Sequence, residues 1–175
     1  MSSNEDEEAE KLLEGMIFTK NIKIENGKLL LLGRPGVIFN ADIIASLFKP
    51  LLDLDPNILF KSGYEAIGTV SDDYKARFND QQSELDFIRK ISKVMGVGKI
   101  DISIQKDKVI VNIYPSTFAE SYAKLYGNSN RPVCYFASGV LSRLLSVILN
   151  KDLHFEEVSC EAKGDSKCVF TADIH

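Results

Sequence analysis

The fold is decided near its C-terminal end by the stretch Glu156-Glu157-Val158-Ser159-Cys160-Glu161-Ala162-Lys163-Gly164-Asp165-Ser166-Lys167-Cys168-Val169-Phe170. This stretch holds two of the three cysteines of the chain, on either side of a loop centred on Gly164-Asp165. Runs of β-type residues flank it, Leu153-His154-Phe155 before and Val169-Phe170-Thr171 after. The pattern predicts a β-hairpin that brings Cys160 and Cys168 close together across its two strands.

The third cysteine, Cys134, begins a strongly apolar, helix-like run, and together the three cysteines are spaced C-x25-C-x7-C. Three thiols and a nearby carboxylate can form a closed, four-coordinate zinc site, because zinc favours thiolates and accepts a carboxylate. Two other states fit the same spacing: three buried reduced cysteines, or a disulfide between Cys160 and Cys168. On a regular strand, alternation puts Glu156 on the face of Cys160.

A wider set of residues resembles the 4-vinyl reductase domain family: Glu157-x-x-Cys160, Gly164-Asp165 and Cys168-x-Phe170, with Pro132-Val133-Cys134 and Gly139 upstream. The match is specific from about residue 132 to 170 and looser back to about residue 30. Members of this family are small-molecule-binding domains, and some are the sensory domains of activators that respond to phenols and other aromatics. Their fold is shared with tethering subunits of the TRAPP complex.

The resemblance implies a set of site residues. A structural zinc in the aromatic-sensing members is held by three cysteines and a glutamate, which fall here on Cys134, Glu157, Cys160 and Cys168. Because alternation favours Glu156, the choice of Glu157 needs a bulge or a strand end. An apolar cavity takes an aromatic hydrocarbon in those members. We predict that its equivalent here is lined by Tyr64, Tyr114 and Phe118; for each, a plain core position is the alternative.

Composition bounds the class of protein. A chain of 175 residues is long enough for one domain with a real core. The net charge is -4, and without the five acidic residues among the first ten positions it becomes +1, which does not indicate a nucleic-acid surface. No apolar run is long enough to span a membrane, and the acidic start is unlike a signal peptide. An odd number of cysteines favours a reducing, cytoplasmic setting.

The order of elements predicts the fold class. We expect strands between residues 15 and 40, helices over 41–54, 56–78 and 85–95, strands over 99–104 and 109–114, helices over 118–126 and 133–150, and the final hairpin. Segregated strands and helices of this kind predict an α+β fold, a single domain with an antiparallel β-sheet backed by helices. Residues 11–175 should form this ligand-binding domain. Residues 1–10 should be a disordered acidic tail or the exposed start of a helix.

The predicted function is the binding of a small hydrophobic or aromatic ligand in an apolar pocket, by a sensor or carrier that forms a homodimer. The sequence contains no Gly-rich phosphate loop, no dinucleotide fingerprint and no HExxH, and its two histidines do not form a catalytic triad. An enzyme is therefore the less favoured alternative. Competing hypotheses are an enzyme of the vinyl-reductase type or a carrier in tetrapyrrole metabolism, and a pure assembly module.

Overall fold

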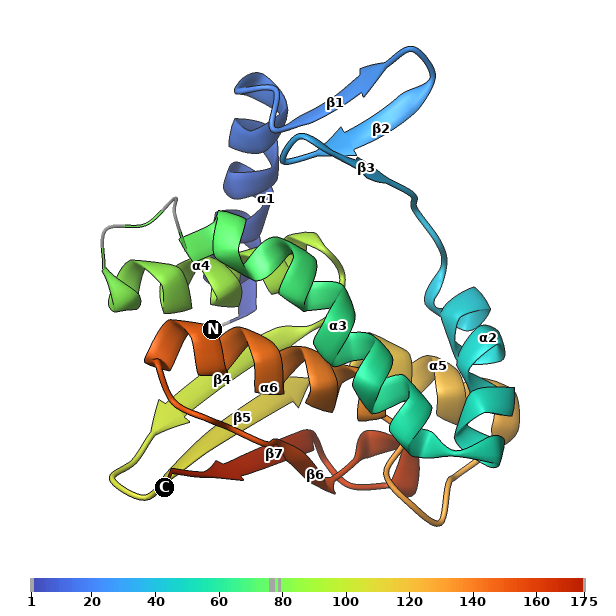
Figure 1. The fold of residues 1–175 in the computed structure, drawn as a ribbon. Coiled ribbons are helices and arrows are strands. Elements are labelled where there is room, and N and C mark those ends of the chain that lie inside the picture. Colours follow the sequence, from blue (N-terminus) through green and yellow to red (C-terminus); the bar gives the residue numbers. More distant parts are fainter. Residues whose placement is uncertain (1, 76–77, 79, 175) are drawn as a thin grey trace.

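The computed structural model describes residues 2–75, 78 and 80–174 (Figure 1). Helices alternate with two groups of strands along the chain. In order, the elements are α1 (Ser2–Phe18), β1 (Ile22–Glu25), β2 (Lys28–Leu31), β3 (Arg34–Gly36), α2 (Ala41–Leu54), α3 (Pro56–Lys75), α4 (Gln81–Val94), β4 (Lys99–Ile104), β5 (Lys108–Tyr114), α5 (Thr117–Tyr126), α6 (Tyr135–Leu149), β6 (Glu156–Ser159), the short 3-10 helix η1 (Glu161–Lys163) and β7 (Cys168–Asp173).

The C-terminal hairpin joins a four-stranded antiparallel sheet with the strand order β4-β5-β7-β6. Every second residue of β5 is buried, namely Val109, Val111 and Ile113, as expected for a sheet with one face on the core. In the register of β5 and β7, Ile113 lies opposite Cys168 and Val111 lies opposite Phe170. The sheet therefore carries Cys168 into the core.

Helix α6 covers this sheet and lies against α3 (Figure 1). The two helices approach so closely that a Cβ atom on Gly63 would lie 2.1 Å from the carbonyl oxygen of Phe136. A Cβ atom on Gly139 would lie 1.9 Å from the carbonyl oxygen of Phe60. Glycine at both positions is thus explained by backbone packing, which compensates for its low helix propensity. The close contact fixes α6, and with it the position of Cys134 at the start of the helix.

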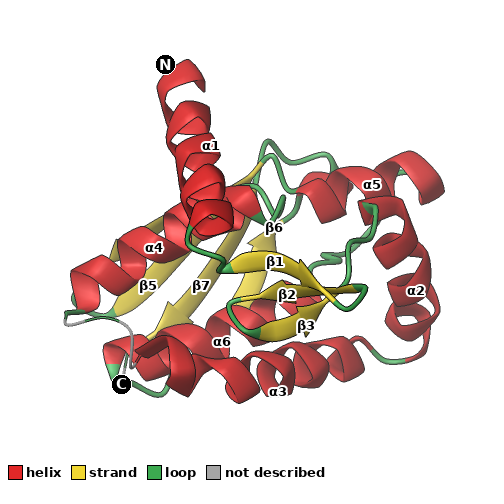
Figure 2. Ribbon diagram, turned by 90° about the horizontal axis from the view of Figure 1, so that it is seen from above, coloured by secondary structure: helices red, strands yellow, loops and turns green. Residues whose placement is uncertain are grey.

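Helices α2 and α5 pack against each other at one end of the molecule, as the view from above shows (Figure 2). Ser116 caps α5, because its side chain accepts a hydrogen bond from the backbone N–H of Ala119. Phe48 of α2 lies beside Phe118 of α5, with ring centroids 5.6 Å apart. These contacts place the start of α5 next to the start of α6.

The N-terminal region differs from the prediction at one point. Strands were expected from Gly15 onward, but residues 15–18 form the last turn of α1. Helical spacing explains this result, because Leu12 and Met16 lie four residues apart and Met16 is buried. An ion pair between Glu7 and Lys11, also four residues apart, adds to helix stability.

The first ten positions were expected to be a disordered tail or the exposed start of a helix. The structure has the second of these alternatives, since residues 2–10 belong to α1 and residues 6–8 are exposed. Position 1 and position 175 lie outside the described residues. The division of the chain into a tail and a domain at residue 11 stays a prediction.

Beyond α1, the three-stranded sheet β1-β2-β3 stands apart from the four-stranded sheet (Figure 1). None of the residues in its strands is fully buried. The segment after it, with Val37, Ile38 and Phe39, is exposed and leads into α2. We call residues 19–40 the arm.

The predicted fold class is confirmed: the chain is an α+β protein with antiparallel sheets and helices. Helix α2 has the predicted bounds, and β4 and β5 match within one residue. The last predicted helix, 133–150, corresponds to α6, and the predicted hairpin corresponds to β6 and β7. None of the helices within the described residues combines the length and the hydropathy that a bilayer span requires.

Candidate metal centre and apolar pocket

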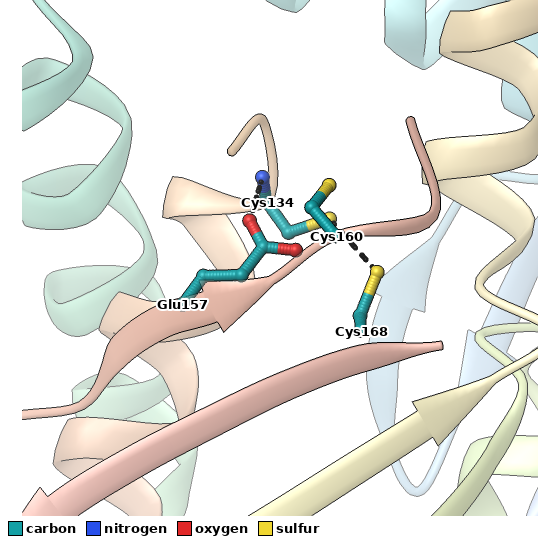
Figure 3. Close-up of side chains that lie close together, drawn as sticks. All are labelled: Cys134, Glu157, Cys160 and Cys168. Atoms are coloured by element: carbon teal, nitrogen blue, oxygen red, sulfur yellow. Dashed lines mark hydrogen bonds between the residues drawn. The ribbon is translucent and has the colours of Figure 1, made fainter. Parts of the chain in front are cut away.

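Three cysteines and one glutamate gather where the start of α6 meets the C-terminal hairpin (Figure 3). One side-chain atom from each of Cys134, Glu157, Cys160 and Cys168 lies within 4.8 Å of all the others. The Sγ atoms of Cys134 and Cys168 are 3.8 Å apart. All three cysteines are free and buried, so the structure does not have the disulfide that the sequence left open.

A β-bulge explains why Glu157, and not Glu156, faces the cysteines. The pairing of β6 with β7 is regular as far as Glu157 and shifts between Glu157 and Ser159. The irregularity adds one residue to β6, which turns Cys160 to the side of Glu157. Glu156 is exposed, whereas Glu157 is partly buried. Simple alternation, which favours Glu156, fails here because the strand is not regular.

Backbone hydrogen bonds hold the cluster in place. The N–H of Cys134 donates to Oε2 of Glu157 at 2.8 Å, which ties the start of α6 to β6 (Figure 3). The N–H of Cys160 donates to Oδ2 of Asp165 at 2.8 Å. Gly164 adopts a left-handed conformation, with φ of 96°, which is the geometry that this turn needs. The Gly164-Asp165 pair therefore shapes the loop that presents Cys160.

Burial and mutual contact shift the pKa values of the cluster. Burial, together with the neighbouring Cys160, raises the pKa of Glu157 to about 8. Hydrogen bonds from Cys134 and Cys168 lower the pKa of Cys160, because they stabilise its thiolate. Its hydrogen bonds to Cys160 and Cys168, and its burial, raise the pKa of Cys134 well above the ordinary value. The cluster thus concentrates negative charge in a buried place.

The pKa of Cys168 is raised as well. The hydrogen bond from Cys134 acts to lower it, but the hydrogen bond to Cys160 and burial outweigh that effect. Two of the three thiols therefore hold their protons near neutral pH unless a cation displaces them.

The geometry and the chemistry of these four residues fit a metal ion. Among the described residues, Oε1 of Glu157 is buried without a hydrogen-bond partner, which a coordinated cation would satisfy. An unsatisfied buried acceptor of this kind costs about 1–3 kcal/mol. Tetrahedral zinc with Zn–S bonds of about 2.3 Å requires sulfur atoms about 3.8 Å apart. Cys134 and Cys168 have this separation. The cluster can therefore hold a metal ion.

Beside the cluster lies an apolar pocket of about 600 Å³. Segments far apart in the sequence form its walls: the end of the arm, α2, the turn after α4, β5, β7 and the first turns of α5 and α6. None of the described side chains that line it is charged. Its aromatic residues are Phe39, Phe48, Phe118, Phe136 and Phe170. Cys134 belongs both to this wall and to the cysteine cluster.

Of the three predicted ligand-binding residues, the structure places Phe118 on the pocket wall. Tyr64 and Tyr114 are not part of this lining, and both are partly exposed. The guanidinium carbon of Arg143 lies 5.7 Å from the centre of the Tyr64 ring. The Nζ atom of Lys99 lies 5.3 Å from the centre of the Tyr114 ring. Cation–π contacts with neighbouring side chains thus account for both tyrosines.

Sequence comparison points to a known family. The uncharacterized protein MJ0745 of Methanocaldococcus jannaschii is 25% identical over 141 residues, which are 80% of this chain and 68% of that protein. The profile of the vinyl-4-reductase domain matches residues 110–174, a segment that contains Cys134, Glu157, Cys160 and Cys168. The chain carries a vinyl-4-reductase domain. The resemblance to the 4-vinyl reductase family is thereby confirmed.

Solved structures share the fold of this vinyl-4-reductase-domain protein. The phenol-responsive sensory domain of the transcription activator PoxR, solved with phenol, superposes with a TM-score of 0.76 at 14% identity, covering 99% of this chain and 92% of that one. A trafficking protein particle complex subunit 3 from Naegleria fowleri, covalently bound to palmitic acid, gives a TM-score of 0.55 at 13% identity. That match covers 78% of this chain and 95% of the subunit. Identities this low show a common fold.

Several pocket residues of the vinyl-4-reductase-domain protein were not predicted as ligand-binding. Phe48, Phe136 and Phe170 are on its wall, and the rings of Phe48 and Phe136 are 5.3 Å apart. Their apolar periodicity was visible in the sequence, but periodicity identifies an inward face without distinguishing a filled core from a cavity. The presence of Cys134 on the wall carried no sequence signal.

Proposed function

We propose that this protein is a non-catalytic binding module for a small, uncharged apolar or aromatic ligand, and that it acts as a sensor or carrier. The observation that carries the proposal is the pocket of about 600 Å³, which has five phenylalanines and no charged side chain among its described lining residues. Apolar ligands gain free energy by leaving water for such walls. An ionised group would lose its hydration without gaining a counter-charge.

The metal in our proposal is zinc, held by Cys134, Glu157, Cys160 and Cys168. Three thiolates and one carboxylate complete a tetrahedral shell and leave no open position, which is typical of a structural site. The four residues come from the start of α6 and from the two sides of the C-terminal hairpin. Bound zinc would therefore pin the start of α6 to the sheet, next to the pocket.

The shared fold suggests the first ligands to test. The PoxR domain was solved with phenol, and the Naegleria subunit carries palmitic acid. Those ligands belong to those proteins, but both are largely apolar, as the pocket wall is here. We therefore propose neutral aromatics and neutral acyl compounds as the ligand class.

Thermal unfolding of the zinc-loaded protein tests this proposal. The panel contains toluene, phenol and hexanol, with benzoate and hexanoate as charged counterparts of similar size. A neutral ligand at about 100 times its Kd should raise Tm by about 5–10 °C, because it binds the native state alone. The charged counterparts should raise it much less. If none of the neutral compounds changes Tm, the binding function is wrong.

The proposed protein is a homodimer. The arm supports this part of the proposal, since a small open sheet without a buried side is not stable alone in water. Ile24 is 79% exposed and Ile38 is 84% exposed. Light scattering should give twice the mass of the chain, and the double variant Ile24→Ser with Ile38→Ser should give the mass of one chain. A monomeric wild-type protein would contradict the proposed dimer.

The competing hypotheses make different predictions in the same experiments. An enzyme of the vinyl-reductase type, or a tetrapyrrole carrier, should bind a tetrapyrrole more tightly than toluene or phenol. A pure assembly module should show no ligand effect on Tm. Three free buried cysteines also support the reducing, cytoplasmic setting that belongs to our proposal.

A further inference from the structure

The metal centre and the pocket share a wall. Cys134 has its Sγ atom in the cluster, and the same residue lines the pocket together with its neighbours Phe136 and Ala137. Its exposed fraction is 3%, so it has little freedom to move independently. A change in the position of Cys134 therefore changes both the cluster and the cavity.

The sheet provides a second link. Ile113 lines the pocket and lies directly opposite Cys168 in the register of β5 and β7. Phe170, two residues after Cys168, has its side chain on the same face and also lines the pocket. The strand that presents one sulfur of the cluster thus also presents a pocket residue.

The third link is Glu161, which directly follows Cys160. Its Oε2 accepts a hydrogen bond of 2.7 Å from the backbone N–H of Ser116, a residue of the pocket wall and the cap of α5. Its own N–H points to Sγ of Cys168 at 3.4 Å. One residue therefore contacts both the cluster and the start of the helix that carries Phe118.

From these three links we infer that the metal centre and the ligand pocket are energetically coupled, with Glu161 as the positioning residue that joins the cluster to the start of α5. This inference rests on the proposed function and adds its regulation. Metal loading orders the pocket wall, and a bound ligand in turn holds the cluster residues in place. By linkage, each must raise the affinity for the other by the same factor.

The first test compares the affinity for toluene of zinc-loaded and chelator-treated protein, and the affinity for zinc with and without toluene. We expect both ratios to be equal and to lie between about 5 and 150, the usual range for coupled sites. If toluene binds equally well to both forms, the coupling is wrong while the binding function stands.

Variants of Glu161 separate the link from a general structural role. Glu161→Ala removes the acceptor for Ser116 and should reduce the coupling ratio several-fold, with zinc and toluene still bound. Glu161→Gln keeps an oxygen that can accept this hydrogen bond and should retain the coupling. Glu120→Ala, an exposed change on α5, is the matched control and should leave the ratio unchanged. An unchanged ratio in Glu161→Ala would overturn the role of Glu161.

Hydrogen exchange gives a readout that needs no ligand. Removal of zinc should speed exchange of the amides of residues 116–120, in the first turn of α5, and Glu161→Ala should do the same in the zinc-loaded protein. If toluene does not bind at all, the proposed function fails for this probe, but the exchange data still decide the coupling. Unchanged exchange in the first turn of α5 after zinc removal would contradict it.

Discussion

Glu157 accepts a hydrogen bond of 2.8 Å from the backbone N–H of Cys134 through Oε2, while its Oε1 is buried without a partner among the described residues. One carboxylate therefore anchors the start of α6 and still has an oxygen for a cation. Few arrangements explain such a group in a native core, because a buried carboxylate needs compensation. The three thiols beside it make metal coordination the simplest explanation.

Replacement of this carboxylate should weaken zinc binding. Glu157→Gln should lower zinc affinity at least about ten-fold, because a neutral amide oxygen is a poorer ligand than a carboxylate. Competition with a chromophoric chelator measures the affinity, and elemental analysis measures the zinc content. Glu156→Gln is the matched control, since Glu156 is exposed on the same strand, and it should not change either quantity. Loss of zinc in Glu156→Gln alone would show that the wrong glutamate was assigned.

Removal of the metal should destabilise the native state. Chelation leaves four buried polar groups without their cation and frees the start of α6 from the hairpin, so we expect a loss of about 3 kcal/mol or more and a fall in Tm of about 10 °C. Differential scanning calorimetry with and without chelator measures this change. Cys168→Ser should behave like the chelated wild-type protein. An unchanged Tm after verified zinc removal would rule out a structural role for the metal.

Zinc affinity should fall as the pH is lowered. The raised pKa values of Cys134 and Cys168 mean that both thiols are protonated near neutral pH in the metal-free protein, so zinc must displace these protons. Each displaced proton weakens binding about ten-fold per pH unit, which gives about 100-fold per unit for two thiols. Below about pH 8, Glu157 adds a further proton. Chelator competition from about pH 6 to about pH 8 measures the slope, and Glu157→Gln should reduce it by about one proton.

Filling the pocket should abolish ligand binding. Ala137 lines the cavity, so Ala137→Phe should occupy part of its volume and lower toluene affinity more than about ten-fold. Isothermal titration calorimetry measures the affinity, and circular dichroism checks that the fold is retained. Tyr64→Leu, which lies outside this lining, should keep the affinity of the wild-type protein. If Tyr64→Leu weakens binding and Ala137→Phe does not, the ligand occupies another site.

The contact between α3 and α6 should not tolerate a methyl group. Gly139→Ala would put its Cβ 1.9 Å from a backbone carbonyl oxygen, which cannot move aside as a flexible side chain can. We expect a loss of about 3 kcal/mol in the free energy of unfolding. Gly15→Ala in α1 is the control, because a Cβ there meets nothing within 4 Å. That change should raise the stability by about 0.5–1 kcal/mol through helix propensity, as urea denaturation would show.

Local patterns in the chain were enough for most of the fold. Apolar periodicity predicted α2, α6 and the β4–β5 hairpin, because side chains recur every 3.6 residues on a helix face and every second residue on a strand. The region from Gly15 to Phe18 was predicted wrongly as β, since its helical state depends on Met16 packing in the core. Cysteine spacing also predicted which hairpin brings Cys160 and Cys168 together.

Local patterns did not suffice for the site. The bulge between Glu157 and Ser159 exists only in the pairing of β6 with β7, and it turns Glu157 toward the cysteines. The cavity beside Cys134 arises from separate segments that meet without filling the space between them. Residue types and their spacing could therefore predict a metal centre and an α+β fold. Which carboxylate joins the sulfurs, and which aromatics face empty space, depends on contacts between residues that are far apart in the sequence.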